Sequence, residues 1–250
     1  MNVSAKKLAR QLCLVFAFFF VSPAFADWDP EYCFPDEDLS ALDDLIFQNL
    51  KRDMVYSLKG SWCSEEKANL LMDLIYLAKP EVCVEVGVFS GSTVLPVATV
   101  LKYLQHGNLI AIDAWSNAEA IKNMEHDDPN RAWWSQVYMD GIYQMFITRL
   151  AERALTSYCR IFRNPSDVAA HFVDEIDFLH LDGDYCEKGS IQDVQLYLPK
   201  VKSGGYILLS NLFVMVKGKA PKMKSFSLLF DACEMICEID KDNAILFRKN

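Results

Sequence analysis

The sequence predicts an α/β fold built on a doubly wound, mainly parallel seven-stranded sheet with helices on both faces. Short apolar, β-branched runs alternate with helical patterns along the chain, and this alternation is typical of parallel strands joined by crossover helices. The first such run and the glycine-bearing turn after it occupy residues 82–93 and lead into the next helix. Two apolar runs near the C-terminus, 232–239 and 244–248, complete the sheet as a closing pair of strands around a polar turn.

The expected elements follow one another in a regular order. Apolar residues at helical spacing from Leu39 to Leu50 predict an N-terminal helix that packs on the domain. Ser64 begins a second helix that ends near Lys79, with the start of a capping box. The five parallel strands are expected at 82–86, 109–113, 158–162, 176–182 and 206–210. Further helices are expected at 91–104, 140–153, 166–173 and 187–197, and 115–140 forms a polar, aromatic segment.

The first 26 residues have the composition of a targeting segment. Three cations precede the apolar stretch Leu12–Val21, and Ala24-Phe25-Ala26 supplies a cleavage site, which together predict a secretory signal peptide. The stretch is short for a transmembrane helix, so we expect export to the periplasm or outside the cell, with no stable membrane span after cleavage. An uncleaved membrane anchor is the alternative. Residues 27–250 then form one domain with a helical lead-in over 27–80.

Charge and cysteine content narrow the class of protein. The formal net charge is −9 and becomes −12 once the three cations of the signal are lost, which argues against a nucleic-acid partner. Seven of the eight cysteines remain after cleavage. An odd number leaves at least one thiol free or paired between chains, so the sequence is compatible with an oligomer. The histidines and cysteines have no zinc-binding spacing.

The turn after the first strand carries the strongest local signal. Glu85 lies at the strand tip, and Gly87 and Gly91 allow the backbone to approach a ligand closely. The free N–H groups of the following helix add polar contacts. The spacing Glu-x-Gly-x-x-x-Gly-x-Ser, which ends at Ser92 and Thr93, differs from the Gly-x-Gly-x-x-Gly pattern of dinucleotide-binding proteins.

Acidic residues stand at the ends of two further strands. Asp113 ends the second strand, and Asp182-Gly183-Asp184 ends the fourth. Carboxyl ends of parallel strands meet at one edge of the sheet, and carboxylates there suit the hydroxyl pair of a ribose. A strand-end turn is the alternative explanation for Asp184, because Asp-Gly sequences favour turns.

These motifs together resemble those of the class I S-adenosylmethionine-dependent methyltransferases, which have a Rossmann-like fold. The chain is most similar to small-molecule O-methyltransferases of the macrocin O-methyltransferase and cephalosporin-hydroxylase-like group. The resemblance covers residues 65–250, and its most specific segments are 112–116, 177–185, 193–199 and 202–209. It implies S-adenosylmethionine as cofactor and a small molecule or glycan as acceptor.

The resemblance also implies roles for individual residues. Asp184 would assist deprotonation of the acceptor, and Asp182 would act beside it as a catalytic or metal-binding residue. The cofactor would be bound by residues from four loops, namely Glu85, Gly87, Gly91, Ser92, Asp113, Trp115, Ser166 and Asp182. The adenine would pass the loop at Ser166 and Asp167.

A divalent metal such as Mg²⁺ is expected to bind only weakly. Metal-dependent members of the group place two further ligands after the fifth strand, where this chain has Ser210 and Asn211. A hydroxyl is a poor ligand for a hard cation, so Asp182 and Asn211 alone would hold it weakly. Two observations motivate a second hypothesis. Ser210 stands in place of an acidic ligand, and a signal peptide precedes a protein whose cofactor is made in the cytosol. The chain would then be an exported, non-catalytic binding protein on a degenerate methyltransferase fold.

Overall fold

The computed structural model describes residues 29–34, 38–239 and 243–250. The predicted signal peptide and residues 240–242 of the predicted C-terminal turn lie outside this part of the chain. Among the described residues, no helix is both long enough and apolar enough to cross a membrane. The seven cysteines at positions 33 to 237 are free thiols, six of them buried.

Seven strands form one sheet in the order β3-β2-β1-β4-β5-β7-β6. The strands are β1 (Val82–Val86), β2 (Asn108–Asp113), β3 (Cys159–Arg163), β4 (Ile176–Leu181), β5 (Val201–Leu209), β6 (Cys233–Ile239) and β7 (Ala244–Lys249). All neighbouring pairs from β3 to β5 are parallel, and β7 runs antiparallel to both β5 and β6. The strand order reverses between β1 and β4, which creates the crevice where ligands bind in such sheets.

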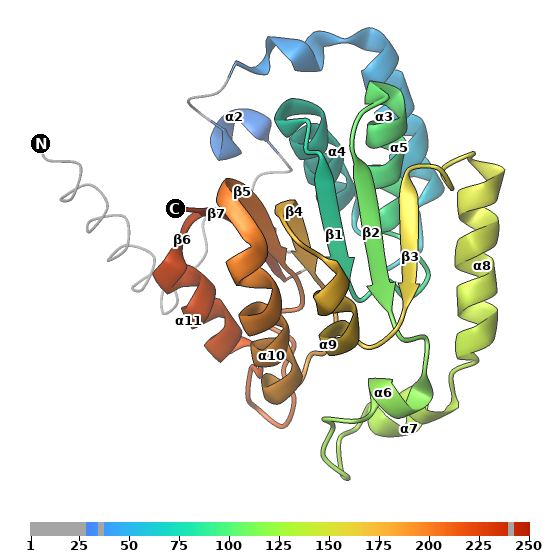
Figure 1. Ribbon diagram of the computed structural model, residues 1–250, viewed down its shortest axis with the longest axis vertical. Helices are drawn as coiled ribbons and strands as arrows, with labels where there is room; N and C mark the ends of the chain where they lie inside the picture. The colour runs from blue at the N-terminus through green and yellow to red at the C-terminus, as the bar shows by residue number, and fades with distance from the viewer. Residues whose placement is uncertain (1–28, 35–37, 240–242) are drawn as a thin grey trace, which may run out of the picture.

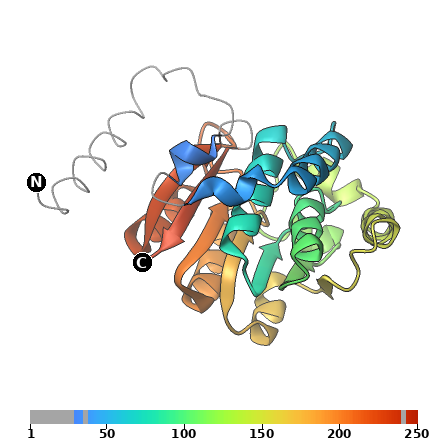
Figure 2. The same ribbon diagram turned by 90° about the horizontal axis from the view of Figure 1, so that it is seen from above.

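Helices cover both faces of the sheet (Figures 1 and 2). One face carries α3 (Leu45–Ser57), α4 (Glu65–Ala78), α5 (Val94–Leu104) and α8 (Met139–Glu152). The other carries α9 (Ser166–Ala169), α10 (Glu187–Tyr197) and α11 (Met223–Ala232). Neighbouring residues of β1 enter different cores, Cys83 on the first face and Val84 on the second, because side chains alternate along a strand.

Shorter elements connect these layers. They are α2 (Pro30–Cys33), η1 (Leu39–Asp43), α6 (Asn117–Ala120), α7 (Arg131–Gln136), η2 (Ala170–Phe172) and η3 (Leu198–Lys200). The helices α6 and α7 lie beyond the carboxyl ends of β1 and β2, at the lower end of the molecule in Figure 1. They build the polar, aromatic segment that interrupts the alternation in the sequence.

The predicted fold class is confirmed, and each predicted strand is present. The N-terminal helix differs in its register. Asp44 accepts hydrogen bonds from the N–H groups of Ile46 and Phe47, so α3 begins at Leu45 rather than near Leu39. Leu45 and Ile46 are consequently 78% and 70% exposed, and the buried face carries Phe47, Met54 and Val55. The helix α11 was not among the elements predicted from the sequence.

Candidate active site

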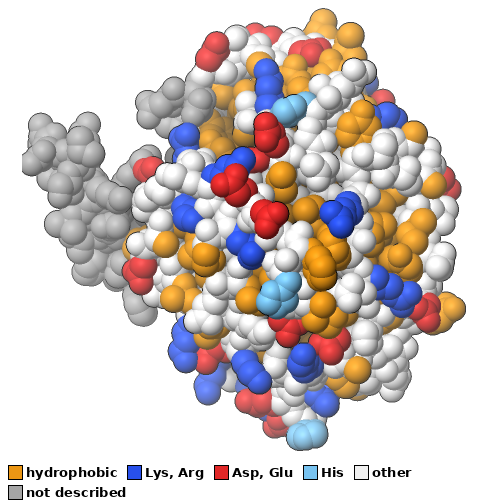
Figure 3. Space-filling view, viewed as in Figure 1, with side chains coloured by type: hydrophobic (Ala, Val, Ile, Leu, Met, Phe, Trp, Pro, Cys, Tyr) orange, Lys and Arg blue, Asp and Glu red, His pale blue; other side chains and the backbone are white. Residues whose placement is uncertain are grey.

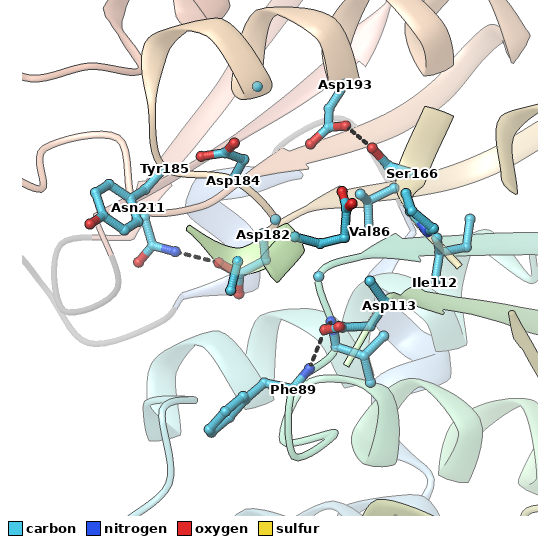
Figure 4. A pocket seen from close by; sticks show the side chains of 18 of the residues that line it. Val86, Phe89, Ile112, Asp113, Ser166, Asp182, Asp184, Tyr185, Asp193 and Asn211 are labelled. Carbon is cyan, nitrogen blue, oxygen red and sulfur yellow. Dashed lines mark hydrogen bonds between the residues drawn. The ribbon is translucent and has the colours of Figure 1, made fainter. Parts of the chain in front are cut away.

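A cavity of about 540 Å³ opens at the carboxyl ends of β1, β2 and β4 (Figure 4). Its volume lies within the range of small-molecule sites. Most residues predicted to bind cofactor, acceptor or metal line it, namely Gly87, Ser92, Asp113, Ser166, Asp182, Asp184 and Asn211. The predicted residues Glu85, Gly91 and Trp115 are not in its wall.

Gly87 and Gly183 meet on the floor of the cavity. A Cβ atom on Gly87 would lie 2.5 Å from both Cα and N of Gly183, and Gly87 has a φ of +88°. The N–H of Asp182 also donates to the Val86 carbonyl at 2.9 Å, which holds the two loops together. Only glycine at position 87 satisfies both the backbone conformation and the contact.

Asp113 fixes the turn after β1 from the end of the neighbouring strand. Its Oδ2 accepts the N–H groups of Val88 and Phe89 at 3.0 and 2.9 Å, and Oδ1 accepts the N–H of Trp115 at 2.7 Å. Burial raises the pKa of Asp113, and the three backbone donors oppose that rise. Oδ2 uses both of its lone pairs in these bonds, and Oδ1 keeps one lone pair free. The carboxylate in the cavity wall can therefore accept a ligand hydroxyl as well.

The three predicted residues outside the wall support the turn from below. Glu85 is buried, accepts a hydrogen bond from Thr93 and pairs through Oε2 with Nδ1 of His180 at 3.2 Å. The indole of Trp115 donates to the Phe89 carbonyl at 2.8 Å, while Gly91 packs against the ring of Phe146. Their contacts position the loop that lines the cavity, and their role in binding cofactor directly stays a prediction.

Asp193 is a cavity residue whose role the sequence did not indicate. It lies on α10, and its Oδ1 accepts the hydroxyl proton of Ser166 at 2.5 Å (Figure 4). Burial raises the pKa of Asp193 to about 6, and the negative charge of Asp184 adds to the rise against the hydrogen bond from Ser166. The periodicity of 187–197 marks only a helix, and the loop that brings Ser166 to this carboxylate is distant in the sequence.

Asp184 has the contacts of a turn residue. Its Oδ1 accepts the N–H of Cys186 at 2.7 Å, just before α10, and Oδ2 accepts from the side chain of Asn123 at 2.7 Å. It rests on Gly189, where a Cβ would overlap the carboxylate. The residue lines the cavity, and its catalytic role stays a prediction.

The predicted metal ligands do not have the donor set of a divalent cation site. The Asn211 side-chain nitrogen donates to Oδ1 of Asp182, and Nζ of Lys67 lies 3.2 Å from Oδ2 (Figure 4 shows the amide contact). Hydrogen-bond donors therefore fill the space around Asp182, where a bound dication would need further oxygen ligands. No group of three or more His, Cys, Asp or Glu side chains suited to a metal occurs in the described ranges. We assign no reaction step to a metal.

Aromatic side chains form one wall at the mouth of the cavity. Trp62 is 60% exposed and stacks on Phe89, with ring centroids 4.5 Å apart and an interplanar angle of 9°. Trp133 and Trp134 of α7 lie 5.8 and 6.2 Å from the Trp62 ring. Trp62, Phe89 and Trp134 border the cavity itself. We call Trp62, Phe89, Trp133 and Trp134 the aromatic wall.

Lys217 joins two loops whose neighbouring residues Met124 and Val214 line the cavity. Its Nζ is 2.7 Å from Oε2 of Glu125 and also pairs with Asp127. Among the other lysines that follow β5, Lys224 pairs with Glu187, and Lys222 is buried. On the face in Figure 3, acidic and basic side chains are accordingly interspersed. Lys217 and Lys224 thus make ion pairs that connect separate segments of the chain.

The strand order with an antiparallel β7, and a cavity beyond the carboxyl ends of β1 and β4, define a Rossmann-like methyltransferase of class I. Residues 84–212 match the family model described as a methyltransferase domain. The chain belongs to this methyltransferase family, whose cofactor is S-adenosylmethionine. No curated protein matches the chain by sequence.

Solved O-methyltransferase structures share the fold. NovP superimposes with a TM-score of 0.60 at 16% identity, covering 85% of this chain and all (100%) of NovP. TomG from Streptomyces achromogenes, a protein of tomaymycin synthesis solved with SAM, has a TM-score of 0.56 at 12% identity and covers 96% of both chains. An O-methyltransferase from Bacillus cereus in complex with SAH has a TM-score of 0.55 at 12% identity, covering 89% of this chain and 98% of that one.

Proposed function

We propose that this chain transfers a methyl group from S-adenosylmethionine to a hydroxyl oxygen of a small molecule or glycan. The observation that carries the proposal is the cavity floor, where Gly87 and Gly183 are in backbone contact beside Asp113. A side chain at position 87 would collide with the backbone of Gly183 and force the two loops apart. The close packing of these two loops, together with a cavity of about 540 Å³, supports a bound cofactor rather than a degenerate site.

The cavity residues divide between the two ends of the cofactor. Asp113 is placed to accept a ribose hydroxyl through the lone pair of Oδ1 that the backbone N–H groups leave open. Ser166 and Asp193 border the place where an adenine ring would lie, and Gly87 admits the methionine end. Bound S-adenosylmethionine would supply a sulfonium methyl group, an already activated donor, so orientation of the acceptor contributes much of the rate.

The acceptor end is bordered by carboxylates and by the aromatic wall. Burial by itself would raise the pKa of Asp182, but the positive charge of Lys67 and neighbouring cations lowers it, so this carboxylate stays ionised. Asp184 would accept the hydrogen bond of the acceptor hydroxyl, with the ionised Asp182 beside it. As the hydroxyl oxygen takes the methyl group, its proton would pass to Asp184. The rings of Trp62 and Trp134 suit a sugar or aromatic ring on the acceptor.

Transfer of a tritiated methyl group to a panel of carbohydrate and aromatic hydroxyl compounds tests this proposal. We expect label in an alkali-stable ether, and a loss in kcat of about a hundredfold in Asp184→Asn. Asp231→Asn, at an exposed position on α11, is the matched control. Label on nitrogen or carbon, or no transfer to any hydroxyl compound, would contradict the proposal.

We also propose that residues 1–26 direct export and are removed after Ala26. The support is the order of basic, apolar and small residues in that segment. N-terminal sequencing of the exported protein should begin at Asp27. A protein that keeps Met1 and sediments with membranes would favour the uncleaved anchor instead.

A further inference from the structure

A buried lysine takes the place beside Asp182 where the sequence left room for a metal. Lys67 is 2% exposed, and its Nζ lies 3.2 Å from Oδ2 of Asp182 and 2.8 Å from Oγ of Ser210. Its backbone is held at the start of α4, where its N–H donates to the Ser64 hydroxyl at 3.0 Å. The helix cap therefore directs this side chain into the carboxyl ends of β4 and β5.

The surroundings of Ser210 fit an ammonium group and do not fit a divalent ion. Ser210 Oγ accepts from Lys67 and lies 2.9 Å from Nε2 of His180, while the Ser210 carbonyl accepts from Nζ of Lys222 at 2.9 Å. Lys222 is also buried. Two lysine side chains thus already lie at this end of the sheet. A further dication would meet repulsion from both.

Asn211 completes the donor set around Asp182. An ionised carboxylate only accepts hydrogen bonds, so the Asn211 amide must present its N–H group to Oδ1, with its oxygen directed elsewhere. Both oxygens of Asp182 are therefore engaged by nitrogen donors. A buried charge is stable only with such partners, because an unpaired carboxylate loses its hydration without compensation.

We propose that Lys67 is the resident cation of the acceptor site, holding and neutralising Asp182 in place of a divalent metal, so that methyl transfer by this chain is independent of metal. Lys67 acts as a positioning residue, because it works through Asp182. Ser210 stands where metal-dependent enzymes of the group have an acidic ligand. The presence of Lys67 explains this difference, because a monovalent cation needs one carboxylate and a dication needs more. The inference rests on the proposed function for its catalytic meaning, and its binding test does not.

Mn²⁺ binding, followed by the electron paramagnetic resonance signal of the free ion, tests the exclusion of metal. We expect the wild-type protein, and Ser210→Asp alone, to leave the signal of added Mn²⁺ undiminished. Lys67→Ala combined with Ser210→Asp removes the ammonium and supplies a second carboxylate. This double variant should lower the free signal in proportion to protein, and adding Asp182→Asn should restore it.

A second measurement tests the inference on a single variant, in case the double variant folds poorly. Ethylammonium chloride should raise the Tm of Lys67→Ala by several degrees, because the ion fits the space left by the side chain. Tetramethylammonium chloride at equal concentration should not, since it lacks N–H donors. Binding of Mn²⁺ by the wild type that Asp182→Asn abolishes would overturn the inference. So would absence of both Mn²⁺ binding in the double variant and ethylammonium rescue. If instead the wild type binds no S-adenosylhomocysteine, the proposed function fails while the result for the resident cation stands.

Discussion

Gly87 and Gly183 are in backbone contact across the loops that follow β1 and β4, so close that a Cβ on Gly87 would lie 2.5 Å from Gly183 Cα. The contact joins the two strands at which the sheet order reverses. Both glycines line the cavity, and their contact accounts for the requirement for glycine at position 87.

The variant Gly87→Ala should therefore displace the loop of Gly183 and weaken cofactor binding by at least tenfold. Gly204→Ala is the matched control, because Gly204 has a similar φ of +81° with nothing within 4 Å of an added Cβ. Both variants carry the cost of a left-handed backbone, about 1 kcal/mol, and only the first carries the steric clash. Titration calorimetry and thermal unfolding separate the two effects. Equal losses in cofactor affinity would show that the contact has no part in binding.

Asp113→Asn should lower cofactor affinity by about tenfold, or about 1.4 kcal/mol, because an amide replaces the carboxylate expected to accept the ribose hydroxyls. Asp177 offers a control at the opposite end of β1, where its Oδ2 accepts the N–H groups of Glu81 and Val82 at 3.0 and 2.9 Å. Asp177→Asn should lower stability and leave affinity unchanged. Unchanged affinity in Asp113→Asn would remove this residue from the cofactor site.

The raised pKa of Asp193 predicts a pH-dependent cost in stability. Its pKa is about 6 in the folded protein and about 3.9 in an unfolded chain, so between these values the folded state binds more protons. The free energy of unfolding consequently falls as pH rises through this window, by at most about 3 kcal/mol. Asp193→Asn cannot ionise. Its free energy of unfolding minus that of the wild type should therefore be larger at pH 7.5 than at pH 4. Denaturant titrations at both pH values measure this difference, and Asp53→Asn, at an exposed position, should show none.

Lys217 should govern how often the outer loops open. Lys217→Met removes the pairs with Glu125 and Asp127, so amide hydrogen exchange over residues 121–130 should accelerate, while the free energy of unfolding changes little. Lys224→Met removes one exposed pair with Glu187 and should leave that exchange unchanged. High salt should act on the wild type as the first substitution does. Identical exchange in both variants would contradict a closing role for Lys217.

The sheet and the cavity wall were predictable because their signals are local. A buried strand, a turn with Gly87 and an acid at the strand end each leave a pattern within a few residues. The exposed N-terminus of α3 was not predictable, because the cap at Asp44 overrides the apolar spacing. Lys67 was recognisable only as part of a helix start. Its contact with Asp182 joins residues 115 positions apart, and a distance of that kind has no trace in local spacing.

Titration calorimetry of the purified protein with S-adenosylhomocysteine tests the central claim most directly. We predict one saturable site per chain with a Kd in the micromolar range, weakened by Gly87→Ala and Asp113→Asn and retained in Gly204→Ala. The absence of heat at high micromolar ligand, with a folded protein, would contradict a cofactor site. That result would favour an exported binding protein that retains the methyltransferase fold without its chemistry.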